Sequence, residues 1–302
     1  MRVGFIGLGN VGGPMAGHVA RAGFPLVIHD LRAAAAAPLL EAGAEWADSP
    51  ADVAARCDLV CTCLPGPPEM EAVMLGARGV LERVQSGAVC VDHTTNAPDV
   101  VRRVGALLAE RGAELLDVPL DGGKEGAVAG RLTLFAGGSD DALARVRPVL
   151  GAYARAVVPV GALGAGSIAK IAHNALAMSI DLLVAECLTL GVKAGVAAPR
   201  LVEAFREGCV VGGNAMFLER LPATLFRGDF SARFALALAH KDFRLAADLA
   251  ARHGVPTRLL DLCERELAEG LHRGWGDLDR TKALTLQEER AGVEIRIPPP
   301  SA

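Results

Sequence analysis

The chain has 302 residues, of which 51% are hydrophobic and only 4% aromatic, so it can form two domains with packed cores. Acidic and basic side chains are intermixed and sum to a net charge of −4, which excludes the basic field that holds a nucleic-acid backbone. We therefore expect no nucleic-acid partner. No apolar run of eighteen residues is free of charges, so we expect no membrane partner either.

The cysteines and the N-terminus indicate the compartment. Seven cysteines occur without a repeated spacing and among apolar neighbours, so we expect reduced, mostly buried thiols in a cytoplasmic protein. The apolar start Met1–Ile6 is too short for a signal peptide. Cys61 and Cys63 form a C-x-C pair, but no second cysteine or histidine cluster lies near it, and we predict no metal site.

In the first 160 residues, short apolar runs alternate with helical patterns. The runs that predict strands are Val3–Ile6, Leu26–His29, Leu59–Cys63, Ala88–Asp92, Glu114–Asp117, Leu132–Ala136 and Ala154–Pro159. Helical patterns between them include Gly12–Ala22, Ala33–Ala42, Glu69–Leu75 and Asp99–Glu110. Continuous apolar strands that alternate with helices are typical of a parallel sheet covered on both faces, so the predicted fold class is α/β with a doubly wound, Rossmann-type sheet.

The pattern changes after Val160. A glycine-rich turn over Gly161–Gly166 is followed by residues 167–194, which contain no helix breaker and predict a helix of roughly 40 Å. The later helical patterns are Arg200–Arg206, Phe234–His253 and Arg258–Glu269. We therefore predict a dinucleotide-binding domain over residues 1–162 and an all-α domain over residues 163–302 that begins with the long helix. The small residues of the second domain predict a homodimer or homotetramer.

A glycine motif follows the first predicted strand. Val3–Ile6 leads into Gly7-Leu8-Gly9-Asn10-Val11-Gly12, which opens the next helix. A G-x-G-x-x-G pattern between a strand and a helix predicts a dinucleotide-binding turn, to which all six residues contribute. Gly7 permits the tight turn, Gly9 lets the backbone approach the pyrophosphate, and Gly12 lets the helix pack closely on the strand. The phosphates are expected to meet backbone N–H groups at the start of the helix.

The end of the second predicted strand bears on the choice of cofactor. Asp30 lies 23 positions after Gly7, where a carboxylate can accept hydrogen bonds from ribose hydroxyls and repels a 2′-phosphate. Asp30 therefore predicts NAD rather than NADP. Leu31 and Arg32 follow at the same edge and belong to the predicted cofactor site. Because a guanidinium can bind a 2′-phosphate, Arg32 keeps NADP open.

Two further turns follow strands at the edge where a doubly wound sheet holds its ligand. Leu64 and Pro65 begin a proline-rich turn, and Thr95 and Asn96 lie in the turn after the fourth long strand. We place Leu64, Pro65 and Thr95 in the cofactor site. Thr95 and Asn96 can hydrogen-bond the nicotinamide side of the cofactor or cap the helix that begins near residue 98. The neighbouring His93 is predicted to be structural rather than catalytic.

Two clusters have no structural explanation in the sequence. One runs from Asp117 to Ala127 and contains Gly122-Gly123, whose backbone N–H groups can bind an anion or a hydroxyl. The other runs from Gly164 to Asn174. On a helix, Lys170 and Asn174 are four positions apart and share one face, so an amine and an amide can hold a substrate oxygen between them.

Together the motifs resemble those of the β-hydroxyacid dehydrogenases, the family that contains 3-hydroxyisobutyrate dehydrogenase and tartronate semialdehyde reductase and is related to 6-phosphogluconate dehydrogenase. They are Gly4–Met15, Asp117–Ala127 followed by Gly137-Gly138, Lys170–Asn174 and Lys241–Ala246, in the family's order and spacing. The resemblance implies a Rossmann-type domain joined through a long helix to an all-α domain. It also implies an NAD(P)-dependent oxidoreductase that interconverts a small 3-hydroxy acid, or a related polyhydroxylated substrate, and its aldehyde or keto form.

The resemblance further implies roles for residues of the second half. Lys170 matches the family's catalytic lysine, a general acid or base for hydride transfer. Asn174 matches an amide that contacts substrate, and the pair His173-Asn174 is similar to the 6-phosphogluconate dehydrogenase pattern, so both belong to the predicted substrate site. Lys241 matches the lysine that closes over the nicotinamide side of the cofactor, and Asp242 is similar to the acid beside it.

One position departs from the family. Gly122 and Gly123 match the glycines that bind the substrate carboxylate, but Asp121 stands where the family usually has serine. A hydroxyl donates to a carboxylate, whereas an ionised Asp only accepts. At ~4 Å and an effective dielectric constant near 20, two negative charges repel by roughly 4 kcal/mol. Asp121 either turns away, for example toward Lys124, or faces a polyhydroxylated or cationic group of the substrate.

Two alternatives stay open from the sequence. One is an imine-reducing enzyme on the same fold, and the other is a dinucleotide-binding scaffold without turnover. In both alternatives we expect the catalytic lysine to be replaced, so the presence of Lys170 counts against them. Asp121 keeps imine reduction open. The sequence does not identify the substrate or the physiological direction of the reaction.

Overall fold

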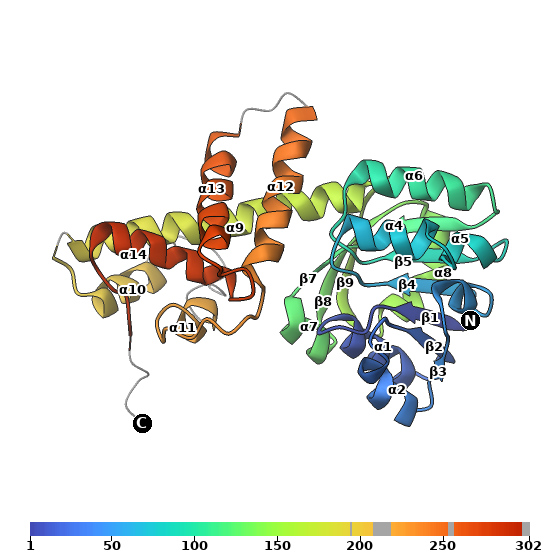
Figure 1. The fold of residues 1–302 in the computed structure, drawn as a ribbon. Coiled ribbons are helices and arrows are strands. Elements are labelled where there is room, and N and C mark those ends of the chain that lie inside the picture. The colour runs from blue at the N-terminus through green and yellow to red at the C-terminus, as the bar shows by residue number, and fades with distance from the viewer. Residues whose placement is uncertain (194, 208–218, 253–256, 298–302) are drawn as a thin grey trace. The chain divides into compact units, whose positions relative to one another are not determined.

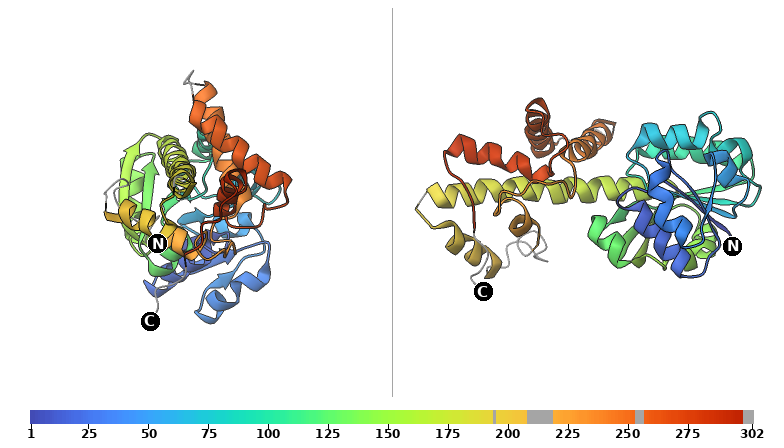
Figure 2. Two further views of the ribbon diagram at one scale, coloured as in Figure 1. Left: turned by 90° about the vertical axis from the view of Figure 1, so that its left-hand side faces the viewer. Right: turned by 60° about the horizontal axis from the view of Figure 1, so that its bottom comes forward.

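The computed structural model describes residues 1–193, 195–207, 219–252 and 257–297. The chain divides into two compact units, Met1–Ile171 and Ala172–Ala302. The predicted boundary after residue 162 lies just before helix α9 (Ala165–Lys193). This helix begins in the first unit and continues without a break into the second (Figures 1 and 2).

The first unit is built on one sheet of nine strands, all within residues 1–161, which the structure describes in full. The strand order is β3-β2-β1-β4-β5-β6-β8-β7, and β9 also pairs with β8. β1 pairs in parallel with both β2 and β4, which is where the strand order of a doubly wound sheet reverses. The strands are β1 (Val3–Ile6), β2 (Leu26–His29), β3 (Glu45–Trp46), β4 (Leu59–Thr62), β5 (Val89–Asp92), β6 (Glu114–Asp117), β7 (Leu120–Asp121), β8 (Leu132–Gly137) and β9 (Ala154–Gly161).

Alternate residues of each central strand enter two different cores. In β1, Val3 and Phe5 belong to the core that includes α1, α2 and α8, whereas Ile6 belongs to the core that includes α3 to α6. Figure 1 shows α1 and α2 on one side of the sheet and α4 to α6 on the other. Burial of both faces explains why these strands are continuously apolar. The helices are α1 (Gly12–Arg21), α2 (Ala37–Glu41), α3 (Pro50–Ala54), α4 (Pro67–Leu75), α5 (Val80–Arg83), α6 (Pro98–Ala109), α7 (Gly123–Ala129) and α8 (Asp140–Leu150).

The predicted strands are confirmed to within two residues at each end, but the sheet differs from the prediction in two ways. The short strands β3 and β7 were not predicted. The sheet is also not wholly parallel, because β8 runs antiparallel to β6 and β7. The chain passes from β7 to β8 through α7, a helix of seven residues that turns the chain back instead of crossing over the sheet.

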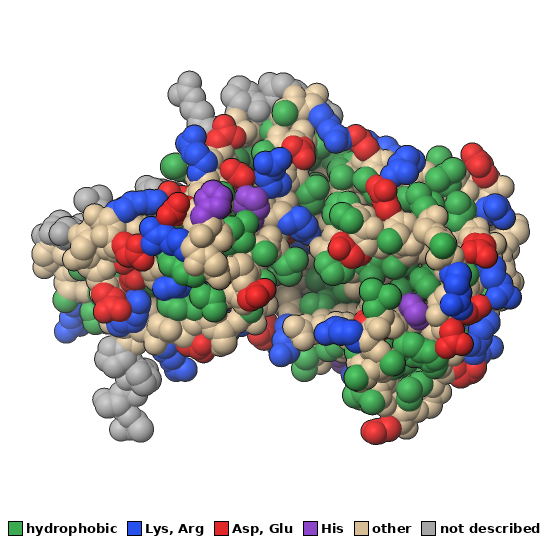
Figure 3. Space-filling view, viewed as in Figure 1, with side chains coloured by type: hydrophobic (Ala, Val, Ile, Leu, Met, Phe, Trp, Pro, Cys, Tyr) green, Lys and Arg blue, Asp and Glu red, His purple; other side chains and the backbone are tan. Residues whose placement is uncertain are grey.

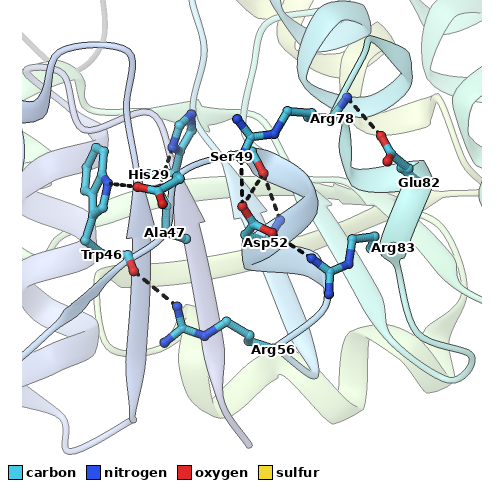
Figure 4. A network of polar contacts seen from close by, with 10 residues as sticks. His29, Trp46, Ala47, Ser49, Asp52, Arg56, Arg78, Glu82 and Arg83 are labelled. Carbon is cyan, nitrogen blue, oxygen red and sulfur yellow. Dashed lines mark hydrogen bonds and ion pairs between the residues drawn. The ribbon is translucent and has the colours of Figure 1, made fainter.

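Polar contacts hold β3 at the edge of the sheet. The ring Nδ1 of His29 lies 2.9 Å from the carbonyl oxygen of Ala47, directly after β3 (Figure 4). Arg56, which follows α3, donates from its guanidinium to the carbonyl oxygen of Trp46 at 3.1 Å. A two-residue strand held in this way has no apolar alternation for sequence analysis to detect.

The regular elements among the described residues of the second unit are helices, and an isolated antiparallel bridge joins Ala235 to Asp279. The unit's two apolar cores form between α9 and the later helices, and Leu188 of α9 is fully buried in one of them. Asp181, also on α9, is buried and forms ion pairs with Arg220 and Arg280, and desolvation lowers the pKa of Arg280 to about 10. The remaining elements are α10 (Ala198–Glu207), α11 (Leu221–Ala223), α12 (Leu236–Arg252), α13 (Arg258–His272), the 3-10 helix Arg280–Leu284 and α14 (Thr285–Ala291). The predicted helix Phe234–His253 corresponds to α12, and its predicted end, His253, lies outside the described residues.

Four further observations concern membrane spans, metal sites, surface charge and cysteines. Among the described residues, no helix is both long and apolar enough to cross a bilayer, and no group of three His, Cys, Asp or Glu side chains could hold a metal ion. Figure 3 shows acidic and basic side chains mixed over the visible face of the molecule. The cysteines whose side chains are described are free thiols, and burial raises the pKa of Cys90 to about 12, which makes it a poor nucleophile.

Candidate functional site

The glycines of the turn after β1 fall into two kinds. Gly7 has a φ of +92°, and a methyl group on it would overlap the carbonyl oxygen of Cys63. A methyl on Gly12 would overlap the carbonyl oxygen of Gly7. A methyl on Gly9, in contrast, would meet no protein atom within 4 Å. Gly7 and Gly12 are therefore required by the packing of the chain itself, whereas Gly9 borders open space into which a ligand can approach.

The other residues of this turn differ in where their side chains lie. The side chain of Leu8 is buried in the core with only 4% exposed, and Val11 packs against the same core. Asn10 is exposed. The backbone N–H of Leu8 donates to Asp30 Oδ2 at 2.7 Å, which joins the turn to the end of β2.

Asp30 is held by the backbone on both sides. Its Oδ1 accepts from the backbone N–H of Arg32 at 2.8 Å, while its Oδ2 accepts from Leu8. Leu31 is 97% exposed, and the guanidinium of Arg32, whose side chain is 73% exposed, lies 3.7 Å from Asp30 Oδ1. A carboxylate held by two backbone N–H groups, an exposed apolar side chain and an exposed guanidinium thus share this edge of the sheet. These residues and the open space at Gly9 fit a bound dinucleotide.

The turns after β4 and β5 are joined by a buried hydrogen-bond network. The backbone N–H of Leu64 donates to the hydroxyl of Thr94 at 3.2 Å. Fully buried Asp92 accepts from the hydroxyl of Thr62 at 2.8 Å and from the side-chain amide of Asn96 at 3.2 Å, and desolvation raises its pKa. This network places the exposed Pro65 and the half-buried Thr95 at the same end of the sheet.

Two expectations for the turn after β5 are wrong. Asn96 is fully buried and uses its amide nitrogen on Asp92 and its oxygen on the backbone N–H of Ala97, so it holds the turn and does not face a cofactor. Helix α6 begins with Ala97 as its N-cap and has no side-chain cap, so neither Thr95 nor Asn96 caps it. The sequence could not show that Asp92 lies beneath the turn and binds Asn96.

His93 is structural in its contacts, as the sequence predicts. Its Nδ1 lies 2.7 Å from the carbonyl oxygen of Val118 and its Nε2 lies 2.9 Å from the hydroxyl of Tyr153. The ring is buried, and desolvation lowers its pKa to about 4. His93 therefore stays neutral and bridges β5 to the segments that follow β6 and α8.

Asp117 and the glycines before Lys170 have a structural explanation that the sequence did not reveal. Asp117, at the end of β6, accepts from the backbone N–H of Gly164 at 2.8 Å and of Ser167 at 2.6 Å, which satisfies donors in the first turn of α9. A methyl on Gly166 would overlap the carbonyl oxygen of Asp117 and lie 2.6 Å from that of Phe135. The glycines therefore let α9 begin directly against the sheet, and desolvation raises the pKa of Asp117.

Lys170 and Asp121 form an ion pair within the first unit. The Nζ of Lys170 lies 3.7 Å from Oδ1 of Asp121, so Asp121 does not turn away from the lysine. The side chain of Lys170 is 9% exposed and that of Asp121 is 45% exposed. Gly122 and Gly123 follow directly, with φ values of +114° and +57°, and begin α7. The structure thus brings together Lys170, which is the predicted general acid–base, Asp121, which departs from the family pattern, and the paired glycines.

The remaining predicted residues meet in the second unit. The amide of Asn174 on α9 donates to Oδ2 of Asp242 on α12 at 2.7 Å, and the Nζ of Lys241 lies 2.9 Å from Oδ1 of the same carboxylate. The Nδ1 of His173 lies 3.4 Å from the amide oxygen of Asn174. Asp242 is 3% exposed and is the centre of the group, a role that sequence analysis, which noted only its place beside Lys241, did not assign.

Comparison with known proteins identifies relatives over both units. Residues 2–161 match the family model of the NAD-binding domain of 6-phosphogluconate dehydrogenase. Residues 164–287 match the model described as NAD-binding of NADP-dependent 3-hydroxyisobutyrate dehydrogenase. The two matches together span nearly the whole chain, in the order that the sequence motifs predict.

Individual relatives match over most of their own length. The chain is 32% identical to 2-(hydroxymethyl)glutarate dehydrogenase of Eubacterium barkeri over 98% of this chain and 97% of that protein. It is 36% identical to 3-hydroxyisobutyrate dehydrogenase of Pseudomonas aeruginosa, over 81% and 83% of the two chains. The solved structure of Mycobacterium tuberculosis 3-hydroxyisobutyrate dehydrogenase with L-serine has a TM-score of 0.85 and 28% identity, covering 95% of this chain and 99% of that one.

Imine reductases also have this fold. The structure of an imine reductase from a Pseudomonas species matches with a TM-score of 0.61 at 19% identity, which is a likeness of fold alone.

Proposed function

The chain belongs to the 3-hydroxyisobutyrate dehydrogenase family, and from this premise we propose that Lys170 is the general acid–base for hydride transfer between NAD(P) and a small 3-hydroxy acid. It is an NAD(P)-dependent dehydrogenase that acts on a small-molecule substrate. The observation that carries the role of Lys170 is its buried amine, held beside Asp121 and the Gly122-Gly123 turn in the same compact unit as the dinucleotide turn.

The role of Lys170 differs in the two directions of the reaction. In oxidation, the neutral amine of Lys170 accepts the proton of the substrate hydroxyl as the C–H bond beside it breaks. In reduction, the ammonium of Lys170 donates a proton to the oxygen of the former carbonyl. Bound NAD(P) supplies or accepts the hydride. Burial of the lysine side chain excludes water from this proton transfer, and positioned transfer of this kind contributes ~10²–10⁴ in rate.

The substrate and cofactor contacts are part of the same proposal. Gly122 and Gly123 offer backbone N–H groups to the substrate carboxylate, and Asn174 and His173 contact the substrate from α9. Asp242 orients both Asn174 and Lys241, since it binds the two at once. The residues proposed to contact the cofactor are Gly7, Leu8, Gly9, Asn10, Val11, Gly12, Asp30, Leu31, Arg32, Leu64, Pro65, Thr95 and Lys241.

Substitution of Lys170 tests the proposal. We expect Lys170→Ala to lower kcat by at least ~10²-fold, while the affinity for NAD(P), measured by protein fluorescence, is retained. Lys124→Ala is the matched control, because Lys124 is an exposed lysine on α7 of the same unit, and its turnover should stay normal. Near-normal turnover of Lys170→Ala with 3-hydroxy acids would reject the role of Lys170. Turnover of cyclic imines but of no hydroxy acid by the native protein would favour imine reduction instead.

NAD is proposed as the preferred cofactor. Asp30 cannot turn aside to admit a 2′-phosphate, because both of its oxygens already accept backbone N–H groups of Leu8 and Arg32. Fluorescence titration with each cofactor at low and high salt should give the lower Kd for NAD. A lower Kd for NADP that rises with salt would show that Arg32 dominates instead. The homodimer or homotetramer and the cytoplasmic location stay predictions; light scattering measures the first and cell fractionation the second.

A further inference from the structure

Asp121 places a negative charge beside the proposed acid–base. It is the last residue of β7, and its backbone is paired with Thr133 of β8, so the sheet determines where the side chain begins. Its carboxylate lies 3.7 Å from the Nζ of Lys170. The two partners differ in burial, with 9% of the lysine side chain exposed and 45% of the aspartate side chain. Asp121 can therefore reach a ligand while it holds the lysine.

The summed charge of the Asp121–Lys170 pair depends on whether Lys170 is protonated. With Lys170 as ammonium, the pair is neutral and offers no excess positive charge to an anionic ligand. With Lys170 as the neutral amine that accepts a hydroxyl proton, the charge of Asp121 is no longer balanced by the lysine. An adjacent positive charge on the substrate then stabilises the reacting state, whereas an adjacent negative charge opposes it.

The other charged side chains of the same segment do not change this balance. Lys124 and Glu125 are neighbours on α7, carry opposite signs and are both exposed. Asp117 is buried and directs its oxygens at backbone N–H groups of α9. Asp121 is thus an anion that lies close to the lysine and also has an exposed surface.

Resting on the proposed function, we propose that Asp121 selects the substrate by charge, and that the preferred substrates are 3-hydroxy acids with an ammonium group on the carbon between the carboxylate and the carbinol. Asp121 accepts from the ammonium, and the N–H groups of Gly122 and Gly123, next in the chain, donate to the carboxylate. The acceptor Asp121 and the N–H donors of Gly122 and Gly123 are consecutive in the chain. They can therefore bind an ammonium and a carboxylate that are attached to the same carbon of the substrate. A serine at position 121 supplies a neutral hydroxyl, which gives no preference of this kind.

Two substrates of nearly equal shape test this inference. Serine and 3-hydroxyisobutyrate share the carboxylate and the CH₂OH group and differ in an ammonium against a methyl on the central carbon. We would measure kcat and KM with NAD for both, using both enantiomers of each, in the native enzyme, Asp121→Ser and Asp121→Asn. Glu125→Gln is the matched control, since it removes one exposed negative charge from α7 of the same unit.

The expected result is a ratio of kcat/KM that favours serine in the native enzyme. Asp121→Ser and Asp121→Asn should each lower this ratio by about tenfold or more, the effect of losing one hydrogen bond between charged groups. The change should appear as a raised KM for serine, and kcat/KM for 3-hydroxyisobutyrate should fall less than kcat/KM for serine in the same variant. Glu125→Gln should leave the ratio unchanged. Because each ratio is measured within one protein, a general loss of stability in a variant cancels.

Two outcomes would contradict the inference and one would contradict its premise. A native preference for 3-hydroxyisobutyrate, or a ratio that Asp121→Ser and Asp121→Asn leave unchanged, would show that Asp121 does not select by charge. Tight NAD binding by the native protein without turnover of either hydroxy acid would instead reject the proposed function. Calorimetric titration of serine into the enzyme with NAD separates the two cases, because it reports binding without turnover.

Discussion

Two glycine-rich turns of the first unit look alike in the sequence and serve different purposes in the structure. In the turn Gly7–Gly12, a methyl on Gly9 would meet only open space, so this glycine is suited to a ligand. In the turn Gly161–Gly166, a methyl on Gly166 would overlap the backbone of β6, so this glycine is required by the protein alone. A glycine pattern thus identifies close approach, but it does not say whether a ligand or another strand approaches.

The same contrast holds for two aspartates. Asp30 directly follows β2 and Asp117 ends β6, and each accepts two backbone N–H groups. Asp30 does so beside exposed side chains, where a ribose can reach it. Asp117 is 1% exposed and ties α9 to the sheet. The sequence predicted a ligand for Asp30 and gave no role to Asp117, and burial distinguishes the two carboxylates.

The largest effect is expected where the glycine serves packing. Gly166→Ala should lower the free energy of unfolding by about 3 kcal/mol or more, because the methyl would collide with backbone carbonyls that cannot move without shifting two strands. Urea denaturation followed by circular dichroism measures the change. Gly43→Ala is not a suitable control because of its φ of +90°, whereas Gly17→Ala is, since its methyl would come no closer than 3.4 Å to a flexible arginine. Native-like stability of Gly166→Ala would remove the distinction between the two turns.

A smaller effect is expected where the glycine serves the ligand. Gly9→Ala should keep the free energy of unfolding within about 0.5 kcal/mol of native, since the methyl meets no protein atom. The affinity for NAD should fall by about tenfold or more, because the methyl occupies space through which the pyrophosphate approaches the backbone. Fluorescence titration and thermal melts in the presence of NAD measure both quantities. Loss of stability without loss of affinity would reverse the assignment.

The smallest effect concerns the buried histidine between the two turns. Burial lowers the pKa of His93 from 6.5 to about 4, so the unfolded chain binds more protons than the folded one between these values. Stability should therefore fall as the pH drops through this window, by about 1 kcal/mol between pH 6.5 and 5.5. His93→Asn keeps a donor toward Val118 and should remove this part of the slope in urea denaturation. Asp92 and Asp117, whose pKa values burial raises, are present in both proteins, so the difference isolates His93. Equal slopes would mean that His93 titrates normally.

Most of the fold could be predicted because its signals are local. Seven apolar runs became strands, since burial on both faces leaves a continuous apolar segment for each. The reversal of β8 could not be predicted, because it depends on whether the segment after β7 crosses the sheet or turns back. α7 has only seven residues and turns back. β3 was missed because two residues carry no periodicity.

The site could be predicted less completely, because its members are joined by contacts between distant segments. The pair Asp121–Lys170 spans two motifs that the sequence treated separately. The link from Asn174 to Asp242 joins α9 and α12 across 68 positions. Asn96 was misassigned because its partner Asp92 has no visible role in the sequence beyond ending a strand. Residue types could be predicted from the motifs, but their partners could not.

The attachment of α9 to Asp117 has a consequence for how such proteins can be recombined. Hydrogen bonds to Gly164 and Ser167 determine where the helix starts, and Lys170 follows within one turn, before the first unit ends at Ile171. Strand β6 therefore fixes the position of the first turns of α9, which carry Lys170, and this does not depend on the later helices. A crossover point directly after Ile171 would exchange the whole helical half with that of a homologue and leave the anchored lysine unchanged.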